Sequence, residues 1–178
     1  VKDGMKKRLP WLILLLFLGM IVSTVVGLFE SVVAEIAIVV CFQSLILDMA
    51  GNVGTQSLAV TIRLLVDENI SAKDKFKFTL KELNIGLSNG TILGLLSFVF
   101  IGFYIMFAKN RPFMDAFILS GCVGVSLFVA MVFSSFVGVV IPMFFHKIKV
   151  DPAVASGPLI TTINDLVAVV TYYGLAWI

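Results

Sequence analysis

Long apolar runs separated by short polar segments dominate the chain. Three of these runs, residues 9–29, 83–107 and 116–145, contain no charged residue. A helix rises about 1.5 Å per residue, and roughly 20 apolar residues cross a bilayer core of about 30 Å. Each run is therefore long enough to form a transmembrane helix. The first run is longer than the apolar region of a signal peptide, so we expect it to be a span.

Two further segments, residues 32–62 and 152–178, have span length but are interrupted by acidic and helix-breaking residues. The first contains a glycine-rich stretch at 50–57, and the second contains a Gly-Pro pair at 157–158. Glycine loosens a helix, and proline removes one hydrogen bond and crowds the preceding turn. We therefore predict an all-α membrane protein of one domain (residues 1–178) with five transmembrane helices, the second and fifth of which are broken.

The composition excludes two other classes of protein. Of the 178 residues, 60% are hydrophobic and 13% are charged, whereas about a quarter are charged in a typical soluble domain. A soluble globule is therefore excluded, and a disordered chain is excluded because disorder requires low hydrophobicity. Cys41 and Cys122 lie in apolar segments and form no CxxC pair, so we expect both to be buried packing residues.

The distribution of basic residues indicates the orientation in the membrane. Of the 13 Lys and Arg residues, all but Lys109 and Arg111 precede span one or lie between spans two and three or four and five. Basic residues favour cytoplasmic loops. We expect the N-terminus, with residues 1–8 as a lead-in, to be cytoplasmic and the C-terminus to be outside. The same sorting leaves three acids within the spans, namely Glu35, Asp48 and Asp165.

Small residues recur at every fourth position in several spans. Gly86, Gly90 and Gly94 form one such stripe, and Gly19, Ser23 and Gly27 form another, while Ser134 and Gly138 continue the pattern in span four. Helices in lipid associate through close backbone approach at small residues. These stripes therefore predict the packing faces of a tight bundle.

The sequence Ser71-Ala72-Lys73-Asp74 has the form of a capping box, which begins a helix. Phe76 and Leu80 then recur on one face of this helix, with lysines on another. The pattern favours a solvated entrance to span three, and a lipid-binding or gating element is the alternative.

The fifth span contains a carboxylate that no basic residue in any of the five segments could neutralise. Asp165 lies about 20 Å from the start of this segment along a straight helix. Thr161, Thr162 and Asn164 surround it with oxygen atoms. A carboxylate at membrane depth indicates an ion or proton pathway, and these surroundings favour a hydrated cation. The alternative is a protonated Asp165 that bonds to a neighbouring helix.

The second span repeats this combination. Asp48, Asn52 and Gln56 are spaced by four residues and share one helical face, where Gly51 interrupts the apolar pattern. The face predicts either a pore lining or a ladder of hydrogen bonds between helices. Asp151 precedes Pro152, so we expect it to begin the fifth span, and it would also attract cations at the cytoplasmic mouth.

The residue pattern does not suggest an enzyme. It contains no His-rich or Cys-rich cluster, no nucleophile with an adjacent base and no phosphate-binding loop. The basic residues flank membrane spans, so nucleic-acid binding has no support either.

Two long motifs resemble the MgtE family of Mg²⁺ channels and transporters. The run GNVGTQS at residues 51–57, followed by Arg63, is similar to the span-two signature of that family. Residues 151–165, from the Asp-Pro pair to TTIND, are similar to its span five, and Arg8-Leu9-Pro10-Trp11 to its entry to span one. The resemblance covers nearly the whole chain.

The resemblance implies a homodimer in the cell membrane with a pore between its subunits, lined by spans two and five. It implies that Mg²⁺, and other divalent cations with it, is the transported and bound ion. In this pore Asp165 from each subunit holds a hydrated Mg²⁺, assisted by backbone carbonyls near Thr161. The metal-site residues that match the family are Asp165, Thr161, Asn164, Asp48, Gly51, Asn52 and Asp151.

Three functions remain open at this point. The first is a Mg²⁺-selective, channel-like pathway, and the second is a secondary transporter that exchanges Mg²⁺ for Na⁺ or H⁺. The third is a structural membrane-anchoring subunit. The resemblance also implies partners outside this chain, because many family members carry cytoplasmic regulatory domains before span one. In the given sequence only the lead-in of residues 1–8 lies there.

Overall fold

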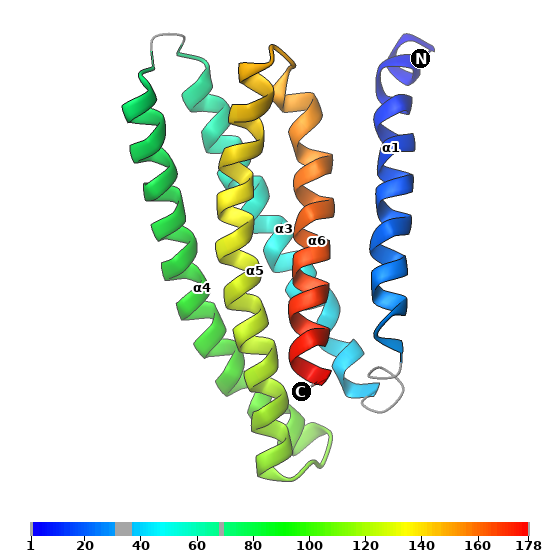
Figure 1. Cartoon of the computed structure of the whole chain (residues 1–178). Coiled ribbons are helices and arrows are strands. Elements are labelled where there is room, and N and C mark those ends of the chain that lie inside the picture. Colours follow the sequence, from blue (N-terminus) through cyan, green and yellow to red (C-terminus); the bar gives the residue numbers. More distant parts are fainter. Residues whose placement is uncertain (1, 31–36, 68–69, 178) are drawn as a thin grey trace.

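The computed structural model describes residues 2–30, 37–67 and 70–177, so the predicted intramembrane Glu35 lies outside the described residues. The regular structure in these ranges is helical, as predicted from the sequence (Figure 1). The helices are α1 (Lys2–Gly27), α3 (Ala37–Leu65), α4 (Ala72–Ala108), α5 (Phe113–Lys147) and α6 (Pro152–Trp177).

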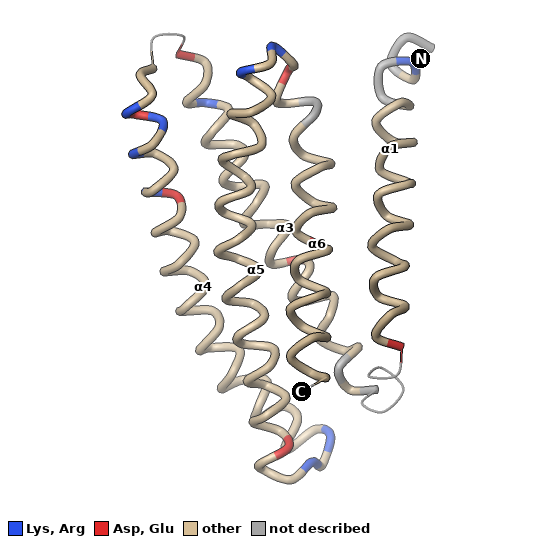
Figure 2. The backbone as a smooth tube through the Cα atoms, in the orientation of Figure 1, with Lys and Arg blue, Asp and Glu red and all other residues tan. Residues whose placement is uncertain are grey.

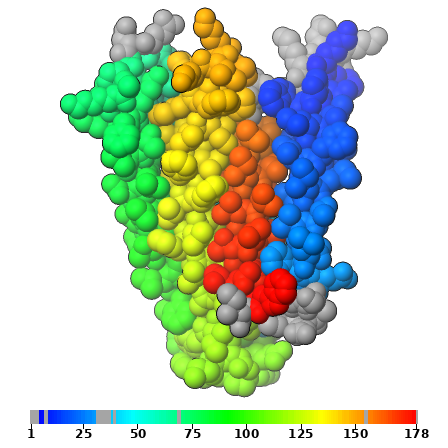
Figure 3. Space-filling model, in the orientation of Figure 1, coloured from blue at the N-terminus to red at the C-terminus, as the bar shows by residue number. Residues whose placement is uncertain are grey.

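Helix α5 lies at the centre of the bundle. It packs against α4, α3 and α6, and α3 also packs against α6. Helix α1 lies at the periphery beside α6, as the space-filling view shows (Figure 3). Phe29, just beyond α1, stacks on Tyr173 of α6 with a ring-centroid distance of 5.7 Å. The elements that carry the candidate ion-binding residues, α3 and α6, are therefore both held by α5.

Close approach between glycines explains why α5 can contact both α4 and α3. A Cβ atom on Gly124 would lie 2.7 Å from the carbonyl oxygen of Gly94 on α4. A Cβ atom on Gly138 would lie 2.7 Å from the carbonyl oxygen of Gly54 on α3. Backbone atoms cannot move aside cheaply, so these positions require glycine.

Of the two glycine stripes predicted to pack against other helices, the structure confirms one and not the other. The stripe on α4 is confirmed, because Gly86, Gly90 and Gly94 all face α5. The two glycines of the α1 stripe make no such contact with the described residues, since a Cβ atom on Gly19 or Gly27 would meet nothing within 4 Å.

The predicted capping box begins α4. The backbone N–H of Asp74 donates to Oγ of Ser71 at 3.2 Å, and the Ser71 hydroxyl donates to Oδ2 of Asp74 at 2.5 Å. Ser71 has an extended backbone, as an N-cap residue does. The helix thus starts eleven residues before the apolar run at 83–107 and continues into it.

The predicted breaks in spans two and five are wrong, because α3 continues through Gly51 and Gly54 and α6 continues through Pro158. Gly54 serves close packing: an added Cβ atom would lie 2.6 Å from Nδ2 of Asn164. Pro158 lies within the second turn of α6, and the loss of one N–H donor there leaves the rest of the helix intact.

Within the described residues, four helices are long and apolar enough to cross a membrane. They are Leu9–Gly27 of α1, α4, α5 and Ser156–Trp177 of α6. Helix α3 has 29 residues and would extend about 43 Å, but it is not one of the four. Asp48, Asn52 and Gln56 lower its apolar character, so a fifth span stays a prediction.

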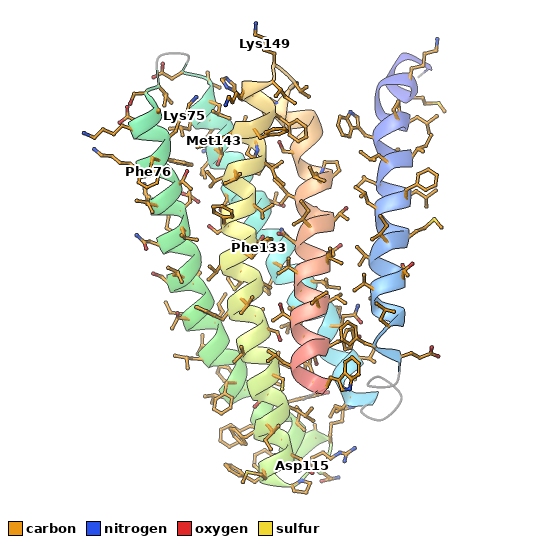
Figure 4. All side chains as sticks on the ribbon, in the orientation of Figure 1. Lys75, Phe76, Asp115, Phe133, Met143 and Lys149 are labelled. Atoms are coloured by element: carbon orange, nitrogen blue, oxygen red, sulfur yellow. The ribbon has the colours of Figure 1, made fainter. Side chains whose placement is uncertain are left out.

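Charged residues gather at the two ends of the bundle (Figure 2). Most Lys and Arg residues lie at the end that holds the N-terminus, the α3–α4 connection and the α5–α6 turn. Lys149 marks this end in Figure 4, and Asp115 marks the opposite end. The spatial arrangement therefore agrees with the alternation counted along the sequence.

The expectation that both cysteines are buried is wrong for Cys41, which is exposed on α3. Cys122 is half-buried on α5, and its Sγ lies 3.7 Å from the carbonyl oxygen of Leu175. The apolar segment around Cys41 supplies exposed positions as well as buried ones, and sequence alone does not distinguish them.

Candidate functional site

Helix α3 carries an exposed polar face. Asp48, Asn52, Thr55 and Gln56 are all exposed in the single chain. Nδ2 of Asn52 donates to Oδ2 of Asp48 at 3.2 Å, and the Thr55 hydroxyl donates to the carbonyl oxygen of Gly51 at 2.8 Å. Both bonds join residues of α3 itself. These two pairs therefore do not form the ladder of hydrogen bonds between helices that the sequence left open as an alternative to a pore lining. The face is available to water, an ion or another chain.

Helix α6 presents Asp165 near its middle. Asp165 is half-buried, and Thr161, one turn earlier, is exposed. The hydroxyl of Thr161 donates to the carbonyl oxygen of Gly157 at 3.1 Å. The hydroxyl of Thr162 donates to the carbonyl oxygen of Pro158, also at 3.1 Å. Both hydroxyl protons are therefore used within the helix, which leaves hydroxyl lone pairs and the Asp165 carboxylate as acceptors for a cation or its water.

Asn164, which the sequence groups with Asp165, is buried where α6 meets α3 and α5. Its side chain is 1% exposed. Nδ2 donates to Oγ of Ser134 at 2.7 Å and to the carbonyl oxygen of Ala50 at 3.4 Å. The Ser134 hydroxyl also donates to Ala50. Oδ1 of Asn164 is buried without a hydrogen-bond partner among the described residues.

Asp151 lies at the beginning of α6, and its Oδ1 accepts a hydrogen bond from the backbone N–H of Ala153 at 2.9 Å. The bond confirms that Asp151 starts the helix as an N-cap residue does. Asp151 is exposed, and it lies 14 residues before Asp165, or about 21 Å along the helix. The two acids therefore belong to different depths.

The structure brings together some of the predicted site residues and not others. Asp48 contacts Asn52, and Asn164 contacts Ala50, which precedes the half-buried Gly51. Asp151 lies apart at the start of α6. No group of three or more His, Cys, Asp or Glu side chains that could hold a metal is found in the described ranges.

Sequence analysis missed one buried acid, Glu82, which it placed at the edge of span three. Glu82 is 7% exposed. Its Oε2 accepts a hydrogen bond from Ser57 of α3 at 3.1 Å, and its carbonyl oxygen accepts one from Ser135 of α5 at 2.7 Å. The spacing along the sequence could have identified this buried acid. Glu82 precedes Gly86 by four residues and therefore lies on the packing face of α4.

Known proteins match almost the whole chain. The sequence profile of the MgtE family, described as divalent cation transporter, matches residues 43–175. The magnesium transporter MgtE of Enterococcus faecalis is 40% identical over 170 residues, which cover 96% of this chain and 36% of that protein. The corresponding proteins of Bacillus subtilis and Thermus thermophilus are 37% and 32% identical over 170 residues.

The chain spans just over a third of the length of these curated relatives, 36% for Bacillus subtilis and 35% for Thermus thermophilus. The resemblance that the two sequence motifs indicated is thereby confirmed over nearly the full chain. The profile match includes the polar face of α3 and Asp165 of α6. This chain belongs to the MgtE family of divalent cation transporters.

Proposed function

We propose that the chain carries Mg²⁺ across the cell membrane through a pore between two copies of itself. The relatives named as magnesium transporters support the choice of ion. The observation that carries the proposal is Asp165, a half-buried carboxylate near the middle of an apolar helix. No Lys, Arg or His side chain in the described ranges pairs with it. A carboxylate at that depth needs water, a proton or a cation.

A second copy completes the site in this proposal. Mg²⁺ keeps several waters and is commonly held through one or two carboxylates. Asp165 from each subunit supplies two, and the exposed Thr161 supports the waters from one turn away. The exposed polar face of α3 faces the same pore, because exposed polar groups within a bilayer require protein or water around them. Helix α3 is then the fifth span, with the basic end of the bundle in the cytoplasm.

Asp48 and Asp151 have separate roles in this pathway. Asp48, whose carboxylate accepts a bond from Asn52, adds negative charge to the α3 face. Asp151 adds negative charge at the cytoplasmic mouth, where it also caps α6. Asn164 lies behind this surface and holds α6 to α3 through the Ala50 carbonyl oxygen. The Gly51 carbonyl oxygen accepts a bond from Thr55 within α3.

Uptake into liposomes that contain the purified chain tests the proposal. We expect Mg²⁺ uptake by the wild type, and we expect the Asp165→Ala and Asp165→Asn variants to lose most of it while remaining dimeric. Asp115→Ala is the matched control, since Asp115 is an exposed acid at the far end of the bundle. Near-normal uptake by Asp165→Ala would contradict the pathway and favour a membrane-anchoring role.

The alternative mechanism is that of a secondary transporter, which would exchange Mg²⁺ for Na⁺ or H⁺. A single carboxylate such as Asp165 could bind these ions in turn. The liposome assay separates the two mechanisms. A channel conducts Mg²⁺ down its electrochemical gradient without a counter-ion, whereas exchange stops when the opposing Na⁺ and H⁺ gradients are removed. We propose the channel because the α3 face offers a continuous set of polar side chains rather than one alternating site.

A further inference from the structure

A hollow of about 420 Å³ lies between α3 and α4, and three carboxamide side chains line it. Asn52 and Gln56 come from α3, and Asn89 comes from α4. The remaining wall consists of apolar side chains, including Met131 of α5. Asn89 thus lines the same hollow as two residues of the exposed polar face of α3. The glycine stripe of its own helix, α4, predicted a packing face only.

The hollow lies at membrane depth. Asn89 is next to Gly90, the midpoint of α4, and lies within the uncharged run at 83–107. Asn52 lies 13 residues before the end of α3 at Leu65, which corresponds to about 20 Å along the helix. The three amides therefore cannot reach the aqueous surface by extension of their side chains.

Two of the three amides have no hydrogen-bond partner among the described residues. Asn52 bonds to Asp48, but the side chains of Gln56 and Asn89 form no hydrogen bond with any described residue. A carboxamide offers two N–H donors and one acceptor oxygen. Unsatisfied amides in lipid are costly, so these amides require water, a hydrated solute or another chain as a partner.

The charge around the hollow favours a cation. Asp48 lies one turn from Asn52 and bonds to it, which brings a carboxylate to the edge of the hollow. Amide oxygens accept hydrogen bonds from water molecules that a cation polarises, and Mg²⁺ retains such waters. Asn89 also borders a neighbouring hollow along α4, which Lys77 and Lys81 line together with Asn84. That second hollow is unfavourable for a cation.

We propose that Asn89 of α4 is a further residue of the ion pathway, where it binds the water shell of a divalent cation together with Gln56 and Asn52. This inference rests on the proposed function. It adds a third helix to a pathway otherwise built from α3 and α6. Asn89 contacts the hydrated ion from the side of α4 and so contributes to selection among cations of different hydrated size.

Liposome uptake of the Asn89→Leu variant tests this role. Leucine has a similar size but cannot bind water, so we expect Mg²⁺ uptake to fall by up to about tenfold, the effect of one lost hydrogen bond to the water shell. Asn84→Leu is the matched control, because it removes an exposed amide from the same helix at the lysine-lined hollow. Equal uptake by the Asn89→Leu and Asn84→Leu variants would overturn the inference.

Cysteine labelling provides a readout that a packing role would not change. In a Cys41→Ser, Cys122→Ser background, we expect the Asn89→Cys variant to react with a membrane-impermeant thiol reagent, and Mg²⁺ to slow the reaction. Leu96→Cys serves as the lipid-facing control and should stay unreactive, since Leu96 is an exposed apolar residue of α4. Absence of labelling at position 89, or labelling that Mg²⁺ does not affect, would contradict the proposal.

Failure of this inference is distinguishable from failure of the proposed function. If Asp165→Ala transports Mg²⁺ normally, the pathway itself is refuted. If Asp165→Ala is inactive while Asn89→Leu matches Asn84→Leu, only the role of Asn89 is refuted. Should Asn89→Leu fail to fold, Asn89→Ala replaces it, because alanine also removes the water-binding amide, and its loss of uptake together with the cysteine labelling decides the question.

Discussion

Ser57 of α3 donates a hydrogen bond of 3.1 Å to Oε2 of Glu82 on α4. The Ser57 hydroxyl also lies 3.3 Å from that of Ser135 on α5, which in turn donates to the Glu82 carbonyl oxygen. Three helices therefore meet at one buried polar junction. Since lipid offers no replacement partners, this junction specifies how α3 and α4 sit on α5.

Replacement of Glu82 by alanine should destabilise the protein. The change leaves the buried Ser57 hydroxyl without its carboxyl acceptor, and an unsatisfied buried group costs about 1–3 kcal/mol. The free energy of unfolding, measured by denaturation in mixed micelles, should fall by that amount. Glu82→Gln retains an acceptor oxygen and should lie between Glu82→Ala and the wild type. Equal stability of all three proteins would show that the junction contributes nothing.

The close approach of α4 and α5 predicts opposite effects for two neighbouring glycines. Alanine at either position gains up to about 1 kcal/mol of helix propensity. At Gly124, however, the new methyl group would lie 2.7 Å from the Gly94 carbonyl oxygen, so Gly124→Ala should lose about 1–3 kcal/mol through overpacking.

Gly121→Ala is the control for this prediction, because its methyl group would meet only Phe98 at 3.8 Å, an ordinary contact. We expect Gly121→Ala to be neutral or stabilising in the same unfolding measurement. A Gly124→Ala variant as stable as Gly121→Ala would mean that α4 and α5 are not in close contact at Gly94.

A double-mutant cycle tests the contact between Asn164 of α6 and Ser134 of α5. The donor–acceptor distance is 2.7 Å, and both side chains are buried. We expect a coupling free energy of about 0.6 kcal/mol, the average for hydrogen bonds between membrane helices, and at most about 1.7 kcal/mol. Unfolding of Asn164→Ala, Ser134→Ala and the double variant gives this value. Strict additivity of the two single changes would contradict the contact.

Asp151 allows the capping role to be separated from the charge. Asn retains the oxygen that accepts from Ala153, whereas Ala removes it. Asp151→Ala should cost about 1 kcal/mol and speed amide hydrogen exchange in the first turn of α6. Asp151→Asn should leave exchange unchanged. If Asp151→Asn nevertheless lowers Mg²⁺ uptake, the negative charge at the mouth acts on the ion directly.

Local signals in the sequence predicted the helices well. The apolar runs located α1, α4 and α5, and the capping box at Ser71 located the first turn of α4 because its hydrogen bonds involve residues only three apart. The Gly86–Gly94 stripe predicted the face on which α4 packs. These features depend on spacing along one helix, which the sequence displays directly.

Features that depend on a second helix were misread or missed. Gly54 was interpreted as a break, although its function is to admit Gly138 and Asn164, which are distant in sequence. Glu82 was not counted among the acids within the spans, because the serine that bonds to it lies 25 residues away. Asn164 was grouped with Asp165 by adjacency, whereas consecutive residues of a helix point about 100° apart.

Ser134 and Ser135 are consecutive residues of α5 and form hydrogen bonds with different neighbouring helices. Ser134 bonds to α3 and α6 through Ala50 and Asn164, and Ser135 bonds to α4 through Glu82. Any rotation of α5 about its axis would open both sets of bonds together. We therefore expect α5 to keep its orientation relative to α3, α4 and α6 when the protein changes conformation.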